Sequence, residues 1–439
     1  MIAPARLVAF ELLQRVAASD GHSDELLRSR QVNALSAQDR NLTTTMVMGT
    51  LRWQMALDAV VRPLLARPEQ ELALPVLTAL RLGAFQLLHL DRVPAHAVLN
   101  DSVELVKQTE ERGAAGMVNA LLRKIAAMPK GTGQDAETAH PAWMVERWRR
   151  FYGTEAVKTI CNYNQHESTA ALRLEDPFAL QELEIEGVEC ASGELLAGAA
   201  RVVKGDVTRT GTFQRGRARM QDEGSQLVAE IAAAAMPEAL KVLDACAAPG
   251  GKTAILAERL TKARITAMEV RPRRLEAMRR NLKAYAKQVA CVQGDATTLK
   301  DGADYDLILC DASCSGTGTM ARNPEIRWRV DAAEVQRQQA RQKAILKSAA
   351  GAVRTGGRVV YSTCSLEPEE NEDVVRAVVA EAELRVVSVD QVLDQMSEAR
   401  MFAEGGEEMV RHAVTDGFLR TLPGVHPCDG FFVAVLERV

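Results

Sequence analysis

The chain has 439 residues, more than one ordinary hydrophobic core accommodates, so we expect two to four domains. Hydrophobic residues make up 47% of it and charged residues 26%, a composition that excludes disordered and fibrous proteins. Its apolar runs are far shorter than a membrane span, and its net charge of −4 argues against indiscriminate nucleic-acid binding.

Residues 1–129 predict an all-helical domain. Apolar residues recur at spacings of three and four, as at Leu7, Phe10 and Leu13, and further helices are expected over 79–93, 96–109 and 116–128. The first twenty residues have the pattern of an amphipathic helix and not of a signal peptide, which favours a cytoplasmic location. The polar, glycine-containing stretch 130–140 predicts a linker.

Residues 141–215 predict a small α+β subdomain, with a helix over 142–153 and short strands over 169–176, 187–192 and 200–207. Six basic residues stand against Asp206 alone in 201–220, and seven stand against Glu276 in 271–287. Basic runs are most often solvated surface, but several on one side of a cleft would follow the phosphates of a nucleic acid. We therefore expect 141–215 to bind RNA.

From residue 216 to 439, strands and helices alternate. Strands are expected over 241–246, 264–270, 289–295, 305–311, 356–364, 384–390 and 430–439. Helices are expected between most of them, the longest over 331–354. This alternation predicts a multi-domain chain whose last part is an α/β, doubly wound, mainly parallel, Rossmann-like domain. In such sheets, ligands bind beyond the carboxyl ends of the strands.

The first of these strands runs into a glycine turn, formed by Cys246, Ala247, Ala248, Pro249, Gly250, Gly251 and Lys252. Neither the P-loop pattern nor the dinucleotide pattern G-x-G-x-x-G matches it. What remains is a strand, a tight turn and a helix start, where backbone N–H groups could receive a ligand carboxylate. The alternative is a plain strand–helix connection.

Acidic residues stand at the ends of the next three strands: Glu269, Asp295 and Asp311. Each alone is more often a cap or turn residue. Together with the glycine turn they describe a pocket for a nucleoside with a cationic, amino-acid-like tail, and S-adenosylmethionine fits that description. We expect the turn to take its carboxylate, Glu269 the ribose, Asp295 the adenine edge and Asp311 the ammonium side. NAD fits worse, because its pyrophosphate would face Asp311.

Two cysteines, Cys314 and Cys364, follow strand ends, and a serine follows each. A disulfide is disfavoured in the cytoplasm, and a metal site is not expected, since no C-x-x-C occurs and the seven histidines are scattered. A thiolate beside a methyl donor suits carbon 5 of a pyrimidine, which becomes nucleophilic once sulfur adds at carbon 6. Lys252 is a candidate for stabilising charge there. A purely structural pair is the alternative.

Several motifs resemble the bacterial RNA (cytosine-5)-methyltransferases of the Sun/Fmu (RsmB-like) family: "CAAPGGKT", "DASCSGTG", "RNPEIRW" and "YSTCSLEPEENE". Residues 1–128 resemble the NusB-like RNA-binding domain of that family, through "DRNLTTTMVMGTLRW" and "MVNALLRK". The resemblance covers essentially the whole chain. It implies that Cys364 is the nucleophile, that Cys314 assists product release, and that the glycine turn and the three acids bind S-adenosylmethionine. It also implies a cytosine in 16S small-subunit rRNA as substrate.

Two positions depart from the family pattern. Ser313 stands where proline is usual, and Ala321 stands where an arginine is common before "RNPEIRW", so one phosphate contact is expected to be missing. The same chemistry on tRNA or 23S rRNA stays open, and a non-catalytic NusB-like RNA-binding or antitermination module is the alternative of another class. We expect no membrane partner and favour a monomer, and we assign no role to Cys428.

Overall fold

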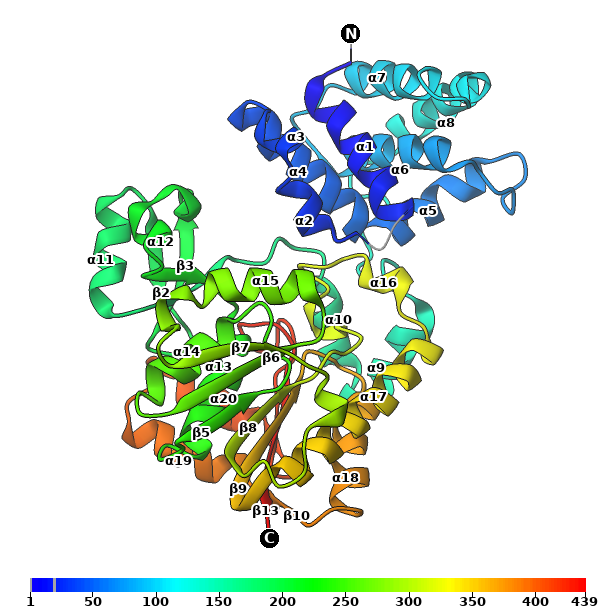
Figure 1. Cartoon of the computed structure of the whole chain (residues 1–439). Coiled ribbons are helices and arrows are strands. Elements are labelled where there is room, and N and C mark those ends of the chain that lie inside the picture. Colours follow the sequence, from blue (N-terminus) through cyan, green and yellow to red (C-terminus); the bar gives the residue numbers. More distant parts are fainter. Residues whose placement is uncertain (1, 19–20) are drawn as a thin grey trace. The chain divides into compact units, whose positions relative to one another are not determined.

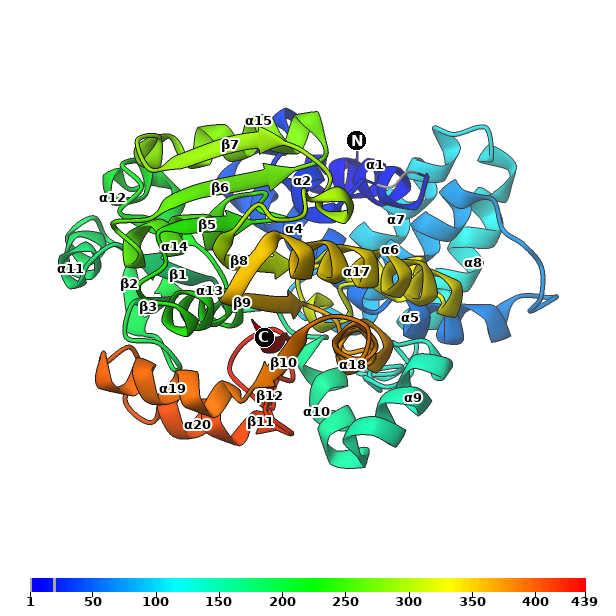
Figure 2. The same ribbon diagram turned by 60° about the horizontal axis from the view of Figure 1, so that its bottom comes forward.

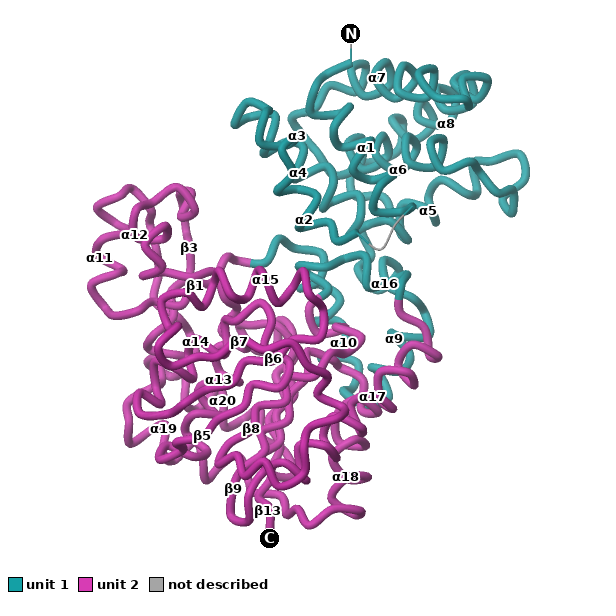
Figure 3. The backbone as a smooth tube through the Cα atoms, viewed as in Figure 1, with its two compact units in different colours: residues 1–168, 320–329 teal, residues 169–319, 330–439 magenta. Residues whose placement is uncertain are grey.

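A computed structural model describes residues 2–18 and 21–439. It divides into two compact units, which Figure 3 shows in different colours. The first, here called the helical unit, comprises the residues up to 168 together with 320–329. The second, here called the sheet unit, comprises residues 169–319 and 330–439. The chain therefore leaves the sheet unit and re-enters it within a ten-residue segment.

The helical unit contains only helices and turns among its described residues, as its apolar spacing predicts (Figure 1). Its helices are α1 (Pro4–Ala18), α2 (Ser23–Leu27), α3 (Arg30–Asn33), α4 (Ala37–Arg52), α5 (Gln54–Val61), α6 (Leu74–His89), α7 (Ala95–Lys107), α8 (Ala115–Ala126), α9 (Ala142–Tyr152), α10 (Thr154–Tyr163) and α16 (Ile326–Arg329). Ser36 caps α4 by accepting a hydrogen bond from the backbone N–H of Asp39. Leucines and valines of α1, α4, α6, α7 and α8 form one core.

Residues 320–329 are held inside the helical unit by buried polar contacts. The carboxylate of Glu325 accepts from the backbone N–H and the hydroxyl of Ser23, at 3.0 and 2.9 Å. Arg327 is fully buried and donates to the carbonyls of Arg52 and Asn164. Trp328 packs against the helical core. Ala321 is buried here, and its carbonyl accepts from Arg52. The missing phosphate contact at Ala321 stays a prediction.

The sheet unit begins with a small antiparallel sheet in the order β2-β3-β1-β4. Its strands are β1 (Ala171–Leu174), β2 (Glu189–Ser192), β3 (Ala199–Lys204) and β4 (Ala218–Met220), with α11 (Pro177–Ile185) and α12 (Gly211–Gln214) between them. Apolar side chains of β1, β3 and α11 form a small core of their own. This agrees with the α+β expectation for this stretch.

The large sheet has the order β11-β12-β13-β9-β8-β5-β6-β7, with β10 paired to β13. Its strands are β5 (Lys241–Asp244), β6 (Arg264–Glu269), β7 (Val289–Gln293), β8 (Tyr305–Asp311), β9 (Val353–Thr363), β10 (Leu384–Val387), β11 (Val414–Thr415), β12 (Phe418–Arg420) and β13 (Phe432–Arg438). Strands β5 to β9 pair in parallel, whereas β13 runs antiparallel to β9. The prediction of a mainly parallel, doubly wound sheet is confirmed.

Helices cover both faces of this sheet, as Figure 2 shows. They are α13 (Glu223–Ala235), α14 (Gly251–Arg259), α15 (Pro272–Asn281), α17 (Ala332–Ala352), α18 (Glu372–Val379), α19 (Val389–Glu398) and α20 (Gly406–His412). Strand side chains alternate between two cores: Val242 packs with α13 and α14, and Leu243 packs with α17 and α18. The central strands β5 and β8 are buried on both faces, which explains why they are mainly apolar runs.

The compact units divide the chain differently from the three expected domains and their linker. Helix α9, expected in the 141–215 subdomain, belongs to the helical unit, and so does α10, which follows it. Part of the expected linker 130–140 is buried, with His140 bonded to the carbonyl of Ala136 and to Asn164. The functional assignment of the three domains stays a prediction. Across the described ranges 2–18 and 21–439, no helix is both long and apolar enough to cross a membrane.

Candidate active site

The sequence-predicted site residues of the sheet unit stand at one edge of the large sheet. Strands β7, β6, β5 and β8 are consecutive neighbours and parallel, so their carboxyl ends point to the same side. Asp295, Glu269, the glycine turn and Asp311 follow or end these four strands in that spatial order. From β5 the chain adds β6 and β7 on one side and then β8 and β9 on the other. Such a switch point is where α/β folds bind ligands.

The glycine turn connects β5 to α14. Gly250 has φ +106°, a conformation in which a side chain would be strained, and α14 begins at Gly251. Its outer side is fixed by Arg274, which donates to the carbonyl of Ala248, and by Asn281, which donates to that of Pro249. Burial raises the pKa of the Cys246 thiol to about 12, so this third cysteine of the edge stays protonated.

Two of the predicted cofactor acids differ in their surroundings. Asp295 is exposed, and the backbone N–H and hydroxyl of Thr297 both bond its carboxylate, lowering its pKa. Glu269 is only 5% exposed. One of its oxygens accepts from the backbone N–H of Arg271 at 2.7 Å, and the other lies 3.5 Å from the guanidinium of Arg274. A ribose at this position would bind a carboxylate already oriented by the start of α15.

Asp311 forms an ion pair with Lys252, whose Nζ lies 2.7 Å from Oδ2, and its Oδ1 accepts from Ser362 at 2.7 Å. Burial lowers the pKa of Lys252, whereas Asp311 and, to a smaller extent, Cys364 raise it. The raising effects together are larger, so the pKa of Lys252 is shifted upward. Lys252 is therefore a cation within electrostatic reach of Cys364. Sequence reasoning had placed Asp311 and Lys252 at the site, and had missed Ser362.

The two cysteines come together. Strands β8 and β9 are parallel neighbours, so the turns that follow them lie at the same edge of the sheet. Cys314 Sγ lies 3.3 Å from Cys364 Sγ, and both residues are half-buried. All eight cysteines are free thiols. The hydrogen bond to Cys364, followed by burial, raises the pKa of Cys314 well above its usual range. Cys314 is thus held as a neutral thiol that can donate a hydrogen bond to Cys364.

Both cysteine turns are tied to one carboxylate, Glu370, which sequence reasoning missed. Glu370 is completely buried. It accepts from the backbone N–H of Ser315 at 2.8 Å, from the hydroxyls of Ser315 and Ser365, and from the amide of Gln342 at 3.1 Å. Burial raises its pKa although these donors act to lower it. The signal was present in the "EPEENE" stretch, which sequence reasoning had taken only as the start of a helix.

Hydrogen bonds fix the first cysteine turn where the family's proline is absent. The carbonyl of Ser313 accepts from Gln342 at 2.9 Å, and the backbone N–H of Ala312 donates to Ser362. The hydroxyl of Thr317 accepts from the backbone N–H of Leu366 in the second turn. The replacement of proline by Ser313 therefore leaves a turn that is bonded on both sides.

The third missed residue is Asp244, the last residue of β5. It is fully buried, and the hydroxyl of Thr253 donates to it at 2.6 Å. Burial, reinforced by the charge of Asp311, raises its pKa to about 7. No periodic pattern distinguishes this aspartate from an ordinary strand-end residue, so only the three-dimensional arrangement identifies it.

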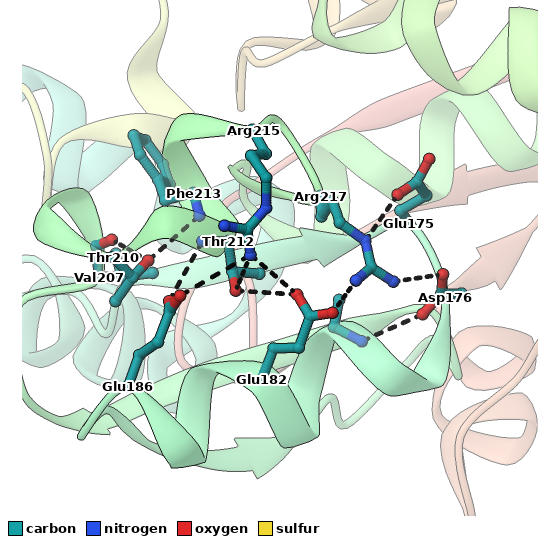
Figure 4. A network of polar contacts seen from close by, with 11 residues as sticks. Glu175, Asp176, Glu182, Glu186, Val207, Thr210, Thr212, Phe213, Arg215 and Arg217 are labelled. Atoms are coloured by element: carbon teal, nitrogen blue, oxygen red, sulfur yellow. Dashed lines mark hydrogen bonds and ion pairs between the residues drawn. The ribbon is translucent and has the colours of Figure 1, made fainter.

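The basic stretch 201–220 is not the free cationic surface that was expected. Figure 4 shows Arg215 and Arg217 among four carboxylates. Arg217 pairs with Glu175, Asp176 and Glu182, and Arg215 with Glu182. Arg201 and Arg219 also have carboxylate partners, Glu194 and Glu258. Four of the six basic residues are therefore paired, three of them with carboxylates of the small sheet and its connections and Arg219 with Glu258 of α14. The run on α15 differs, since Arg273 and Arg280 are exposed.

Comparison with known proteins gives consistent matches. Residues 232–437 match the model of the family "16S rRNA methyltransferase RsmB/F", and residues 3–127 match that of the NusB family. A Bacillus subtilis (strain 168) protein named "Probable ribosomal RNA small subunit methyltransferase B" is 32% identical, covering 99% of this chain and 98% of its own. A Xanthomonas campestris pv. campestris "Ribosomal RNA small subunit methyltransferase B" is also 32% identical, over 91% and 89%. The crystal structure of PH0851 has the same fold, with a TM-score of 0.76, 23% identity and coverage of 100% and 99%.

Proposed function

Because the chain belongs to the RsmB/F family of 16S rRNA methyltransferases, with an N-terminal NusB-family domain, we propose that it methylates carbon 5 of a cytosine in 16S rRNA through a covalent cysteine adduct. S-adenosylmethionine is the methyl donor of this enzyme family. The observation that carries the proposal is the thiol pair: Cys314 and Cys364 lie 3.3 Å apart, beside the Lys252–Asp311 ion pair.

The residues at the strand ends fit S-adenosylmethionine chemically. Its cationic tail suits an edge that presents Asp311 and Glu269, and its carboxylate suits the glycine turn at the start of α14. Asp295, which is exposed at the end of β7, is available to the adenine edge. When bound there, the cofactor supplies an electrophilic methyl group. We assign Cys246 to Lys252, Glu269, Asp295 and Asp311 to its binding.

The two thiols divide the remaining work. In the proposed mechanism Cys364 adds as a thiolate to carbon 6 of the cytosine, and the charge of Lys252 favours the thiolate. Carbon 5 thereby becomes nucleophilic and takes up the methyl group. A base takes up the carbon 5 proton, the double bond re-forms, and the Cys364 sulfur leaves as a thiolate, to which the Cys314 thiol donates a hydrogen bond. The raised pKa of Cys314 supports a neutral thiol that assists this departure and does not itself attack.

The substrate assignment rests on the relatives, which are named for small-subunit ribosomal RNA. The test is to incubate the protein with labelled S-adenosylmethionine and 16S rRNA from cells that lack the gene, and to map the product by bisulfite sequencing. We expect one or a few 5-methylcytosines in 16S rRNA, and none with Cys364→Ala. Label in tRNA or 23S rRNA alone would refute the substrate, and label at another atom would refute the mechanism.

A further inference from the structure

The helical unit contains a pocket that the proposed methyl transfer does not use. It has a volume of about 290 Å³ and is lined by residues of α4 and α6, which pack together, by Trp53, and by residues 134 and 165–167. All the residues that line it belong to the helical unit. Those that matter below are Gly49, Arg52, Trp53, Phe85, His89 and Gln165.

One wall of the pocket is aromatic. The rings of Phe85 and His89 are stacked, with centroids 5.1 Å apart at 20°, and Trp53 lies 4.8 Å from His89 at 40°. Gly49 makes this packing possible, since a Cβ there would come within 1.9 Å of the Phe85 ring. Trp53 and His89 are both partly exposed. Partly exposed aromatic rings in the wall of a pocket suit a planar ligand.

The other wall carries polar atoms without partners. Gln165 is 8% exposed, and neither atom of its amide has a hydrogen-bond partner. His89 Nε2 is also unpaired. Burial, with a contribution from Lys130, lowers the pKa of His89 to about 4, so its ring is neutral. The amide nitrogen of Gln134 lies 3.3 Å from Nδ1 of His89. If the amide donates to Nδ1, the ring proton of His89 is on Nε2. Buried polar groups without partners are costly, so a ligand that pairs with them is stabilised.

The charges of the pocket disfavour an anion. Arg52 donates both Nε and Nη2 to the carbonyl of Ala321, and Glu167, which also lines the pocket, partly offsets its charge. The fitting ligand is therefore neutral, planar, small enough for about 290 Å³, and able both to donate and to accept hydrogen bonds. A nucleobase has these properties, and proteins read single-stranded RNA by stacking unpaired bases on aromatic and histidine rings.

We propose that this pocket binds one unpaired base of the RNA substrate. The base stacks on Trp53 and His89, and the side-chain amide of Gln165 rotates to form hydrogen bonds with the edge of the base. The proposal rests on the proposed function only in taking RNA as the partner. It gives the helical unit a specific contact in addition to any general attraction for phosphate, and it places that contact away from both cysteines in sequence and in a different compact unit.

The test compares full-length Gln165→Leu and Trp53→Leu with Gln70→Leu and Trp143→Leu, exposed residues of the helical unit that do not line the pocket. Binding to a 16S rRNA transcript is measured by filter retention, and thermal unfolding is measured alongside. Loss of a stacked or edge-paired base should weaken binding roughly 5- to 150-fold for the pocket variants. Gln165→Leu should not lower the unfolding temperature, because it removes a buried unpaired amide.

Equal RNA affinity of the pocket variants and wild type would overturn the proposal, and so would a loss of affinity that only accompanies unfolding. If wild type bound no RNA, the proposed function and this inference would fail together. If wild type bound and methylated 16S rRNA while the pocket variants bound normally, the inference alone would fail. A mixture of the four free nucleosides should not compete at the RNA concentrations used, and full competition would identify the pocket as a free-nucleoside site instead.

Discussion

At the scale of the residue, the thiol pair depends on a carboxylate that contacts neither sulfur. Glu370 bonds Ser315, which follows Cys314, and Ser365, which follows Cys364. Each cysteine turn is therefore held by its neighbouring serine to the same carboxylate, and both serine hydroxyls donate to its Oε2. A carboxylate accepts up to four hydrogen bonds, whereas a glutamine amide offers one oxygen and must place two donors in the same space.

We expect Glu370→Gln to separate the cysteine turns. Hydrogen bonds to charged groups contribute about 1.5–3 kcal/mol, so the unfolding free energy should fall by about that amount and methylation should fall with it. The matched control is Glu381→Gln, whose exposed ion pair with Lys347 should contribute little. Thermal unfolding and single-turnover methylation measure the two effects. Unchanged values in Glu370→Gln would show that Glu370 does not hold the turns.

Asp244 predicts a pH dependence of stability. Its pKa is about 7 in the folded protein against 3.8 ordinarily, so the folded state binds a proton more tightly than the unfolded state. Its contribution to stability is fully present below the ordinary value and is lost as the pH rises through about 7. Asp244→Asn keeps an oxygen for Thr253 and cannot titrate. The unfolding temperature of wild type relative to this variant should therefore fall between about pH 5 and about pH 8. A constant difference would contradict the shift.

At the scale of the element, the segment 320–329 is the least expected part of the fold. It leaves the sheet unit directly after the first cysteine turn and returns before α17, yet its contacts are with α2, α4 and the end of α10 in the helical unit. Burial without a carboxylate at hydrogen-bond distance lowers the pKa of Arg327 to about 9. The segment is thus held by hydrogen bonds to backbone carbonyls and by Trp328.

Arg327→Ala should loosen this segment, because it leaves two carbonyls unpaired in the interior and creates a cavity. An unpaired buried group costs about 1–3 kcal/mol, so a loss of at least about 2 kcal/mol is expected. Arg337→Ala, on the exposed face of α17 beside Glu334, is the control and should cost less than about 1 kcal/mol. Hydrogen exchange at 326–329 is the measurement. Exchange as slow as in wild type would show that Arg327 does not anchor the segment.

Most elements were predictable because they rest on local patterns. The five parallel strands are continuous apolar runs bounded by turns, and the thiol and acid positions follow from their ends. Two contacts were not predictable, since they join residues distant in sequence: Glu370 with Ser315, and Glu325 with Ser23. The ion pairs of the basic stretch 201–220 were not predictable for the same reason. Arg201 pairs with Glu194 and Arg217 with Glu182 of α11, and nothing in the local sequence reveals those partners. RNA binding by this stretch stays a prediction.

At the scale of the whole molecule, the threading of the chain decides how the two units can be separated. A cut after residue 168 removes α1 to α10 but leaves 320–329 attached to the sheet unit. Trp328 and Arg327 would then lose the core and the carbonyls that cover them. If the helical unit is removed by simple truncation, a loss of RNA affinity can therefore come either from the missing unit or from aggregation through the newly exposed apolar surface.

We expect residues 169–439 alone to aggregate, and expect the same fragment with 320–329 replaced by a short glycine–serine link to stay monomeric. The linked fragment should bind S-adenosylmethionine, because all its proposed cofactor residues are retained, but should bind 16S rRNA more weakly and with a flatter salt dependence. Light scattering and calorimetry are the measurements. An unlinked fragment as soluble as the linked one would show that the segment needs no cover.

The central claim, that two non-equivalent thiols carry out cytosine methylation, is tested most directly by trapping the covalent adduct. Wild type, Cys314→Ala and Cys364→Ala are incubated with 16S rRNA and S-adenosylmethionine and separated by denaturing electrophoresis. Cys314→Ala should accumulate a protein–RNA species that ribonuclease dissolves, because Cys364 still attacks but cannot readily leave. Cys364→Ala should form neither adduct nor 5-methylcytosine. An adduct in Cys364→Ala and none in Cys314→Ala would reverse the two roles, and unchanged turnover in both variants would contradict thiol catalysis altogether.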